Sequence, residues 1–404
     1  MNEETEYRKN WGLSEEDIKF RNEAKKFVLD HISPVADDIE ENDDFQLIRE
    51  IYKKMGKENL LSLPFKKYYR GWLKDPGVIN STLLAEEICR VSAAPGIAFG
   101  ASMFIGKALY TGGSDYILET YLKPITTGEK FGSICITEPT VGSDVANMKT
   151  KADLDGDEWV INGKKRFITN AGESKLNLIY CVTDPNLIRK RKHMSCIVVE
   201  DNTRGFSTKQ YKYMGRRGFR NGEIILDNVR VPKENLVGNQ GDGHKILMTQ
   251  FNTERTTIAG QCIGIATGAF EEAKDFAKKR EQFGSVIAKK QGIYFKIADM
   301  ATKLDASRLL CYRVAKMIDE KLPPRALMRE AAMAKMYASE AGKEIVDSSL
   351  QILGGEGWTK FGYGTIYHVE RYYRDIRIHT IGGGTTTMNK YLIATKELDM
   401  QLNL

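Results

Sequence analysis

Apolar residues recur at helical spacing over the first third of the chain. A helix start is indicated at Ser14, because an acid follows at Asp17 and apolar residues then return every three or four positions. Similar amphipathic patterns follow at 44–55, 78–91 and 97–109. We expect Pro95-Gly96 to interrupt a long helix, because proline inside a helix removes a backbone hydrogen bond. The N-terminal block is therefore predicted to be helical.

From Gly132 onward the pattern changes to short apolar runs bounded by turn residues. These runs lie at 133–137, 159–162, 165–169, 178–183, 194–200 and 223–231. The segments Asp155-Gly156-Asp157 and Asn162-Gly163 are hairpin signals. We therefore predict a compact antiparallel β domain. Its basic run at 186–192, with Arg189, Lys190, Arg191 and Lys192, is interpreted as a solvated hairpin tip.

The chain becomes helical again after Gly243. Patterns of helical length cover about 244–279, 290–321 and 324–353. A chain of 404 residues is long enough for two or three domains. We predict an α+β protein with an N-terminal helical domain at 1–131, a middle β domain at 132–243 and a C-terminal helical domain at 244–404.

The charge balance argues against a nucleic-acid-binding protein. The chain has 60 basic and 54 acidic residues, for a net charge of +6, and the two signs are mixed along its length. Nucleic-acid binding would favour basic residues gathered on one face. No apolar run approaches the roughly 20 residues that cross a bilayer, and the N-terminus has neither an export nor a transit signal. We therefore expect a cytoplasmic protein without a membrane span.

Residue types that bind metals are scattered along the chain. The six cysteines form no CxxC pair and are expected to be reduced, buried thiols: Cys89, Cys135, Cys181, Cys196, Cys262 and Cys311. The five histidines lie far apart and form no ligand cluster: His31, His193, His244, His368 and His379. We therefore predict no metal site.

Two segments of the β block carry candidate chemistry. The run at 134–144 ends in the turn Gly142-Ser143-Asp144, and Phe167-Ile168-Thr169-Asn170 follows about thirty residues later. A turn of this kind exposes backbone N–H groups that suit an anionic ligand. Taken alone, an ordinary surface turn is the more frequent explanation, because Gly, Ser and Asp populate any turn.

The order of several motifs is more specific. Ile-Thr-Glu-Pro at 136–139, Gly-Ser-Asp at 142–144 and Phe-Ile-Thr-Asn at 167–170 resemble the middle domain of the acyl-CoA dehydrogenase family. Later motifs match the family in order, at 280–284, 351–355 and 370–375. The resemblance implies an FAD flavoprotein that oxidises an acyl-CoA between its α and β carbons. It also implies a four-helix bundle in the C-terminal domain, a homotetramer, and an electron-transfer flavoprotein as the electron acceptor.

The catalytic base is the chief departure from the family pattern. Most members have a Glu in a Tyr-Glu-Gly-Thr segment, whereas this chain reads Ile-Gly-Gly-Gly-Thr at 381–385 and has Gly383 at that position. Either the chain is not a dehydrogenase or its base comes from elsewhere. The segment 251–255 resembles the isovaleryl-CoA and long-chain branches, which implies Glu254 as the base. Isovaleryl-type enzymes also have a small residue at the vacated position. By sequence alone, a helical Glu followed by Arg is more often solvated or ion-paired.

The resemblance assigns further roles. Donors at the thioester oxygen stabilise charge that develops there, and the N–H of Gly383 is implied as one of them. Ser143, Phe251, Asn252, Arg255 and Gly384 are implied to contact the substrate. Ile136, Thr137, Phe167 and Thr169 are implied to meet the flavin ring, and Ser143, Thr385 and Thr387 the phosphates or adenosine. Arg280, Gln282, Phe283, Gln351 and Gly355 are implied to complete the FAD site across a subunit interface.

Several alternatives stay open at this point. A base on the other helix favours a branched, cyclic or otherwise substituted acyl group. Four arginines are candidates for binding a second carboxylate: Arg90, Arg216, Arg217 and Arg220. A reductase or a non-oxidising lyase acting on acyl-CoA would share this fold. A flavoprotein that binds nucleic acid is a further alternative, and the mixed charge pattern disfavours it.

Overall fold

The N-terminal block is helical, as predicted. The computed structural model describes residues 10–400. Its first helices are α2 (Glu15–His31), α3 (Ala36–Asn42), α4 (Phe45–Lys57), α5 (Val78–Val91), α6 (Ala93–Gly112), α7 (Asp115–Ile117) and α8 (Lys123–Thr126). Ser14 caps α2, and its side chain and that of Asp17 bond to each other's backbone N–H groups in a capping box. This capping confirms the predicted helix start.

The predicted helix break at Pro95-Gly96 is wrong in its position. The backbone leaves the helical region at Ser92 (φ −150°, ψ 125°), between α5 and α6. Pro95 and Gly96 lie in the first turn of α6. Proline is tolerated there because the first N–H groups of a helix have no intrahelical partner.

The middle block is a seven-stranded sheet. Its strands are β1 (Gly132–Cys135), β2 (Lys151–Asp155), β3 (Glu158–Thr169), β4 (Leu176–Val182), β5 (Met194–Glu200), β6 (Phe206–Gln210) and β7 (Asn221–Pro232). They follow the order β1-β4-β2-β3-β7-β6, and β5 also pairs with β4. The prediction of an antiparallel domain is wrong for two pairs, because β1 runs parallel to β4 and β2 also pairs with β4 in parallel. Sequence patterns could not reveal these pairings, because the strands are far apart in the chain.

One of the two predicted hairpins is confirmed. Gly156 and Asp157 turn the chain between β2 and β3, where Asp155 pairs with Glu158. The hairpin predicted at Asn162-Gly163 is wrong, because β3 continues through these residues with a register shift against β7. Gly163 is needed there since a Cβ atom would stand 2.5 Å from Thr150 Oγ1. The two predicted strands at 159–162 and 165–169 are therefore one strand.

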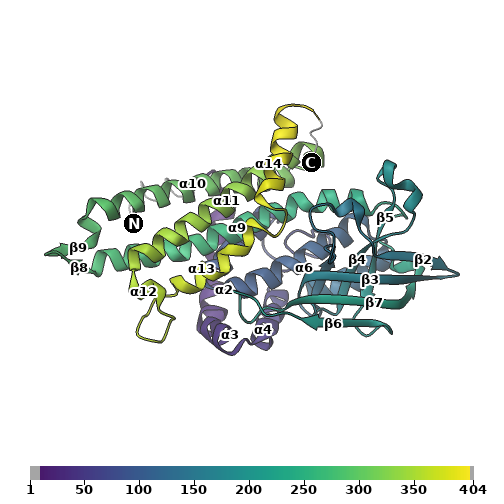
Figure 1. Cartoon of the computed structure of the whole chain (residues 1–404), viewed down its shortest axis with the longest axis horizontal. Helices are drawn as coiled ribbons and strands as arrows, with labels where there is room; N and C mark the ends of the chain where they lie inside the picture. The colour runs from purple at the N-terminus through teal and green to yellow at the C-terminus, as the bar shows by residue number, and fades with distance from the viewer. Residues whose placement is uncertain (1–9, 401–404) are drawn as a thin grey trace.

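The C-terminal block is again helical. It contains α9 (Gly243–Lys279), α10 (Gln291–Asp319), α11 (Pro324–Leu353), α12 (Gly355–Trp358), α13 (Val369–Ile376) and α14 (Thr386–Glu397). Between α9 and α10 the small strands β8 (Glu281–Gln282) and β9 (Ser285–Val286) form a hairpin. Figure 1 shows the sheet at one end of the molecule and β8 and β9 at the other, with α9 running between them. The predicted domain boundaries lie near these transitions and stay a prediction.

A buried carboxylate joins the first and last blocks. Glu86 on α5 accepts hydrogen bonds from Arg308 Nε at 3.0 Å and Tyr312 Oη at 2.5 Å, both on α10. Arg21 of α2 donates to the same side chain at 2.8 Å. A buried carboxylate is tolerated when such partners satisfy it. This network fixes α5 and α10 around the buried helix α9.

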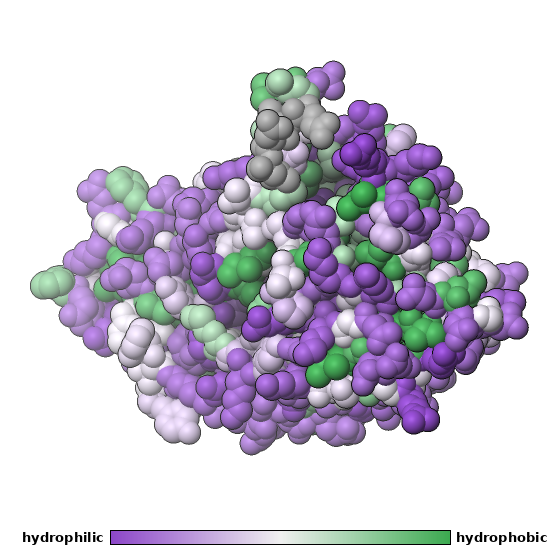
Figure 2. All heavy atoms as spheres, turned by 45° about the vertical axis from the view of Figure 1, so that its right-hand side comes forward, coloured by the Kyte–Doolittle hydropathy of each residue, from purple (hydrophilic) through white to green (hydrophobic). Residues whose placement is uncertain are grey.

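The face of the molecule in Figure 2 is mainly hydrophilic. Figure 2 shows hydrophilic residues over most of one face, with hydrophobic residues scattered among them. No helix within residues 10–400 is long and apolar enough to cross a membrane. The six cysteines are all free and buried, which confirms the expectation of buried thiols.

Candidate active site

Glu254 lies on α9 near the junction of the three blocks. Its Oε2 atom is shielded from solvent and has no hydrogen-bond partner among the described residues. Burial raises the pKa of this carboxyl to about 7, although Arg255 and Lys335 oppose the shift. A carboxylate with a pKa near neutrality is suited to general acid or base catalysis.

Gly383 faces the Glu254 carboxylate. A Cβ atom built on Gly383 would stand 3.8 Å from Glu254 Oε1 and only 2.3 Å from Ile258 Cδ1. The residue also has φ +66°, a conformation that favours glycine. The structure therefore brings together the two positions that the sequence singled out, and a side chain at 383 would require Ile258 to move and the backbone to keep a strained conformation.

Two buried side chains hold the loop that carries Gly383. Lys335 on α11 donates from Nζ to the carbonyl oxygen of Gly384 at 2.6 Å, and Asn389 Nδ2 donates to the same oxygen at 2.9 Å. Thr385 caps α14, since its Oγ1 accepts from the N–H of Met388 at 3.1 Å. Burial lowers the pKa of Lys335 to about 8. Sequence reasoning missed Lys335 and Asn389, although a lysine within the alanine-rich stripe of α11 was a usable signal.

Arg255 is a buried cation beside this loop. A Cβ atom on Gly384 would stand 3.9 Å from Arg255 Nη2, and the guanidinium lies 5.2 Å from the ring centroid of Phe251. Its Nε atom is buried without a hydrogen-bond partner among the described residues, and burial lowers the pKa of the side chain. Asn252 donates to the carbonyl oxygen of Pro324 at 2.8 Å. Arg255 and Gly384 therefore lie together, while the Asn252 amide nitrogen is occupied by α11.

A buried ion pair shapes the turn after β1. Lys165 Nζ lies 2.8 Å from Glu138 Oε1 and donates to the carbonyl oxygen of Ile136 at 3.1 Å. The other end of the Glu138 carboxylate accepts from the backbone N–H of Lys149 at 2.6 Å. Buried pairs of this kind persist when further hydrogen bonds satisfy them. Ile136 and Thr137 are therefore held by contacts that the sequence did not reveal.

Phe167 and Thr169 lie beside this turn. The N–H of Arg166 donates to the carbonyl oxygen of Thr137 at 2.7 Å, which places the end of β3 next to the end of β1. The β3–β7 register shifts between Lys165 and Ile168, and Phe167 has φ +57° and a 54% exposed side chain. The irregularity turns an aromatic face outward, close to Ile136 and Thr137. Ser143 lies exposed in the segment that follows β1.

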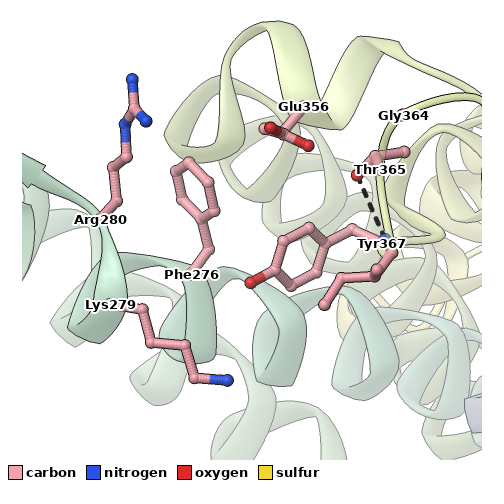
Figure 3. Close-up of a pocket in the computed structure, with 8 residues that line it drawn as sticks. Phe276, Lys279, Arg280, Glu356, Gly364, Thr365 and Tyr367 are labelled. Carbon is pink, nitrogen blue, oxygen red and sulfur yellow. Dashed lines mark hydrogen bonds between the residues drawn. The ribbon is translucent and has the colours of Figure 1, made fainter.

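A second group of predicted residues lies at the opposite end of α9. Arg280 and Phe283 follow α9 and are exposed, as is Gln351 at the end of α11. At roughly 1.5 Å per residue, α9 places Arg280 about 39 Å from Glu254. Arg280 also borders a pocket of about 350 Å³ with Glu356, which follows Gly355, and Figure 3 shows Arg280 and Glu356 projecting on its rim. Within a single chain, five of the predicted residues are therefore distant from the Glu254 site: Arg280, Gln282, Phe283, Gln351 and Gly355. Thr385 and Thr387 lie near that site.

The arginines considered for a second carboxylate differ in their partners. Three lie beside protein carboxylates: Arg90 beside Glu271, Arg217 beside Glu40 and Arg220 beside Asp43. The guanidinium of Arg216 instead lies 3.1 Å from His379 Nε2. Burial and Arg216 hold the pKa of His379 well below its usual value, so the imidazole is neutral. Arg216 is therefore the one of these four whose guanidinium makes no salt bridge to a carboxylate within residues 10–400, although its backbone N–H donates to Asp375 and that carboxylate opposes the fall in its pKa.

Comparison with known proteins decides the family. Residues 14–129, 133–229 and 241–398 match the N-terminal, middle and C-terminal domains of acyl-CoA dehydrogenase. The chain belongs to the acyl-CoA dehydrogenase family. It is accordingly an oxidoreductase of a family that uses FAD.

Individual members of the family are similar over nearly their whole length. The chain is 36% identical to an acyl-CoA dehydrogenase of Bacillus subtilis over 95% of this chain and 98% of the relative. It is 36% identical to the caffeyl-CoA reductase-Etf complex subunit CarC of Acetobacterium woodii, with the same coverage. It is 31% identical to the mitochondrial isovaleryl-CoA dehydrogenase of Pongo abelii, over 95% of this chain and 88% of the relative.

A solved structure confirms the acyl-CoA dehydrogenase fold. The butyryl-CoA dehydrogenase of Megasphaera elsdenii superposes with a TM-score of 0.88 at 29% identity, covering 96% of this chain and 99% of that one. The order of helical, β and helical blocks is therefore that of the family. Dehydrogenases and an Etf-linked reductase both occur among the relatives, so family membership leaves the direction of the reaction open.

Proposed function

We propose that this protein is an FAD-dependent acyl-CoA dehydrogenase that forms a 2-enoyl-CoA with Glu254 as the base. The observation that supports this most strongly is the Glu254 carboxylate facing Gly383, where most of the family carries the base. Ile258 occupies the space that a side chain at 383 would enter, and Glu254 places a carboxylate beside that position.

Each residue of the site has a chemical task in this proposal. Glu254 takes the α proton, and its pKa of about 7 allows it to be deprotonated at neutral pH and still hold that proton. The N–H of Gly383 stabilises negative charge on the thioester oxygen. Lys335 and Asn389 fix that N–H by binding the carbonyl oxygen of Gly384.

The residues at the end of β1 fit a flavin. Phe167 offers an exposed aromatic face, and Ile136 and Thr137 lie beside it in a turn held by the Lys165–Glu138 pair. These residues and Thr169 would hold the ring, and Ser143, Thr385 and Thr387 would lie toward the phosphates. FAD bound there supplies the acceptor for the electron pair released when the substrate is oxidised.

The second group of residues supports a homotetramer. Arg280, Gln282 and Phe283 are exposed, and Phe283 is 94% exposed. They lie about 39 Å from Glu254 along α9, too far to contact the same cofactor as Glu254 in one chain. We propose that they complete the FAD site of a neighbouring subunit. An electron-transfer flavoprotein is proposed as the electron acceptor, because one relative is named as part of an Etf complex.

The acyl group is proposed to be branched, cyclic or otherwise substituted. A base on α9 in place of one at 383 favours substitution near the reacting carbons, and one relative is an isovaleryl-CoA dehydrogenase. Arg216, whose guanidinium makes no salt bridge to a carboxylate among the described residues, motivates an additional test of acyl groups that carry a second carboxylate.

Reduction of a 2-enoyl-CoA is a second candidate function. A group with a pKa of about 7 donates a proton as readily as it accepts one near neutral pH, so Glu254 suits both directions. Relatives named as reductases act on caffeyl-CoA and acryloyl-CoA. A non-oxidising lyase has no comparable support.

Anaerobic titration of the yellow protein tests the proposal. A panel of acyl-CoAs is added to the oxidised protein, and the matching 2-enoyl-CoAs to the dithionite-reduced protein, while flavin absorbance is followed. We expect one acyl-CoA to bleach the flavin in wild type and in Glu344→Gln, a control at an exposed glutamate of α11, and not in Glu254→Gln. Bleaching that persists in Glu254→Gln removes its role as base. Reoxidation by enoyl-CoAs without bleaching by acyl-CoAs favours the reductase.

A further inference from the structure

Arg166 lies in a β-bulge at the edge of the proposed flavin site. In this bulge two residues of β3, Arg166 and Phe167, lie opposite the single residue Glu223 of β7. A bulge of this kind re-aims side chains and is frequent beside active sites. The N–H of Arg166 donates to the carbonyl oxygen of Thr137 at 2.7 Å. Arg166 therefore borders the turn that is proposed to hold the flavin ring.

The Arg166 guanidinium lies between two aromatic rings. Its central carbon is 4.8 Å from the ring centroid of Phe167 and 5.7 Å from that of Tyr211. The two ring centroids are 5.9 Å apart. Tyr211 is itself anchored, because its Oη donates to Glu223 Oε2 at 2.6 Å. Since ring faces attract cations, the two rings hold the Arg166 cation beside Phe167.

The backbone of Phe167 is also held in place. It has φ +57°, which is rare for a bulky residue. Asn221 Nδ2 donates to the carbonyl oxygen of Phe167 at 3.2 Å, and Asn221 Oδ1 accepts from Tyr213 Oη at 2.5 Å. Residues in such conformations persist when their surroundings fix them, and they cluster at functional sites. The exposed part of the Phe167 ring therefore keeps a fixed position relative to Arg166.

The charge of Arg166 is not neutralised by a salt bridge. Its guanidinium makes none within residues 10–400, whereas its neighbour Lys165 pairs with Glu138 at 2.8 Å. The Nε atom of Arg166 is shielded from solvent and has no hydrogen-bond partner in the same range. Salt screens a half-buried cation less than an exposed one. A ligand that lies against Phe167 therefore meets a positive field from Arg166.

We propose that Arg166 raises the reduction potential of the flavin bound against Phe167. Reduction adds electrons to the flavin, so a nearby cation stabilises the reduced form more than the oxidised form. A higher potential shifts the equilibrium between an acyl-CoA and its 2-enoyl-CoA toward dehydrogenation. Arg166 acts here through its charge. The inference rests on the proposed function, because it requires FAD at Phe167.

The test measures the potential of the protein-bound flavin without any substrate. Dithionite is added anaerobically in the presence of a reference dye, and the absorbance of flavin and dye is followed. Wild type is compared with R166M, which removes the charge, and with R166K, which keeps it. The control variant R204M removes a charge from an exposed arginine in the turn between β5 and β6.

We expect R166M to lower the ratio of reduced to oxidised flavin about tenfold at a given potential, which is about 30 mV for a two-electron couple. R166K and R204M should stay near wild type. In a fixed mixture of the acyl-CoA that reduces the flavin and its 2-enoyl-CoA, the same ratio should fall by the same factor in R166M. A purely structural role of Arg166 would leave the potential unchanged.

Three outcomes overturn the inference. They are an unchanged potential in R166M, an equal fall in R166K, and an equal fall in R204M. If R166M loses its flavin during purification, R166Q replaces it in the same comparison. A lowered potential in R166M, together with a wild-type flavin that no acyl-CoA reduces, supports the inference and removes the proposed dehydrogenation. A flavin spectrum that does not change in Phe167→Leu removes the flavin from Phe167, and the inference about Arg166 fails with it.

Discussion

The two ends of α9 differ in how fully a single chain surrounds the candidate binding residues there. Near its start, Glu254 lies shielded between Gly383, Arg255 and Lys335, and the loop at 382–385 is held by buried donors. Beyond its end, Arg280 and Phe283 are exposed, and the Arg280 guanidinium makes no salt bridge within residues 10–400. The first region can set a pKa within one chain. The second has groups suited to a ligand and little protein around them.

This difference teaches where each property of the enzyme comes from. A shifted pKa needs desolvation, which the packing of a single chain supplies at Glu254. Recognition of a charged nucleotide needs exposed donors, which a second subunit can bring to the site. We therefore expect variants at the start of α9 to change rate and pH dependence, and variants beyond its end to change cofactor retention.

The largest expected effect comes from a methyl group on Gly383. Gly383→Ala would place Cβ 2.3 Å from Ile258 Cδ1 at a residue with φ +66°, and so displace the N–H that we propose meets the thioester. We expect the rate of flavin reduction by an acyl-CoA, measured by stopped flow, to fall about 10²-fold, since a shift of about 1 Å can cost that much. Adding Ile258→Val removes the clashing methyl and should restore part of the rate.

Gly382→Ala is the matched control for this change. The nearest atom to a Cβ there is the carbonyl oxygen of Ile378 at 3.8 Å, and Gly382 has no positive φ. Its rate should stay near that of wild type. Equal losses of the flavin-reduction rate in Gly382→Ala and Gly383→Ala would show that the loop tolerates a side chain at neither position. The claim that Gly383 has a special steric role would then be wrong.

Arg280→Ala sharpens the contrast from the other end. The variant removes the proposed charge-assisted hydrogen bond to a cofactor phosphate, which should weaken FAD binding about tenfold to hundredfold. Flavin retention after gel filtration measures this loss, and the rate at saturating FAD should match wild type. Arg204→Ala, at an exposed arginine in the turn between β5 and β6, should retain its flavin. A rate defect of Arg280→Ala that persists at saturating FAD would contradict the separation of the two ends.

The stability of Glu254→Gln should depend on pH in a defined direction. The folded-state pKa of about 7 lies above the ordinary value of 4.5, so the folded state binds this proton more tightly than the unfolded state. Wild type therefore loses stability as pH rises from about 4.5 to about 7, and the neutral variant does not. We expect Glu254→Gln to melt a few degrees above wild type at pH 8 and close to it at pH 4. Glu344→Gln, at an exposed glutamate, should show no such trend.

The smallest expected effect is a shift in the pH profile of Lys335→Met. The Lys335 cation lowers the pKa of Glu254, so its removal should raise that pKa. The acid limb of kcat/KM should then move to higher pH, by no more than about one unit. Lys296→Met, at an exposed lysine of α10, should leave the profile unchanged. An unshifted acid limb in Lys335→Met would mean that Glu254 does not sense this cation.

Local patterns in the sequence predicted the helices well. The capping box at Ser14 and the pattern at 324–353 define α2 and α11, because helix caps and periodicity depend on residues within a few positions of one another. The break placed at Pro95-Gly96 was wrong because proline in the first turn of a helix costs little. The hairpin at Asn162-Gly163 was wrong because the contact of Gly163 with Thr150 decides the local strand path.

The candidate site was predicted through ordered motifs, and its supporting residues were not. Glu254 and Gly383 were paired by resemblance, and their contact gives that pairing a physical basis. Lys335, Asn389 and the Lys165–Glu138 pair were missed, since each acts on a segment distant in the chain.

By itself, the sequence determined the helical, β and helical order, the family and the residue types available for chemistry. Those properties follow from local periodicity and from motifs that are contiguous in the chain. The parallel pairing of β1 with β4, the closeness of Gly383 to Glu254 and the raised pKa of that carboxyl become visible only in the folded chain. The physical reason is that strand partners, steric room and desolvation are set by atoms brought together from distant parts of the chain.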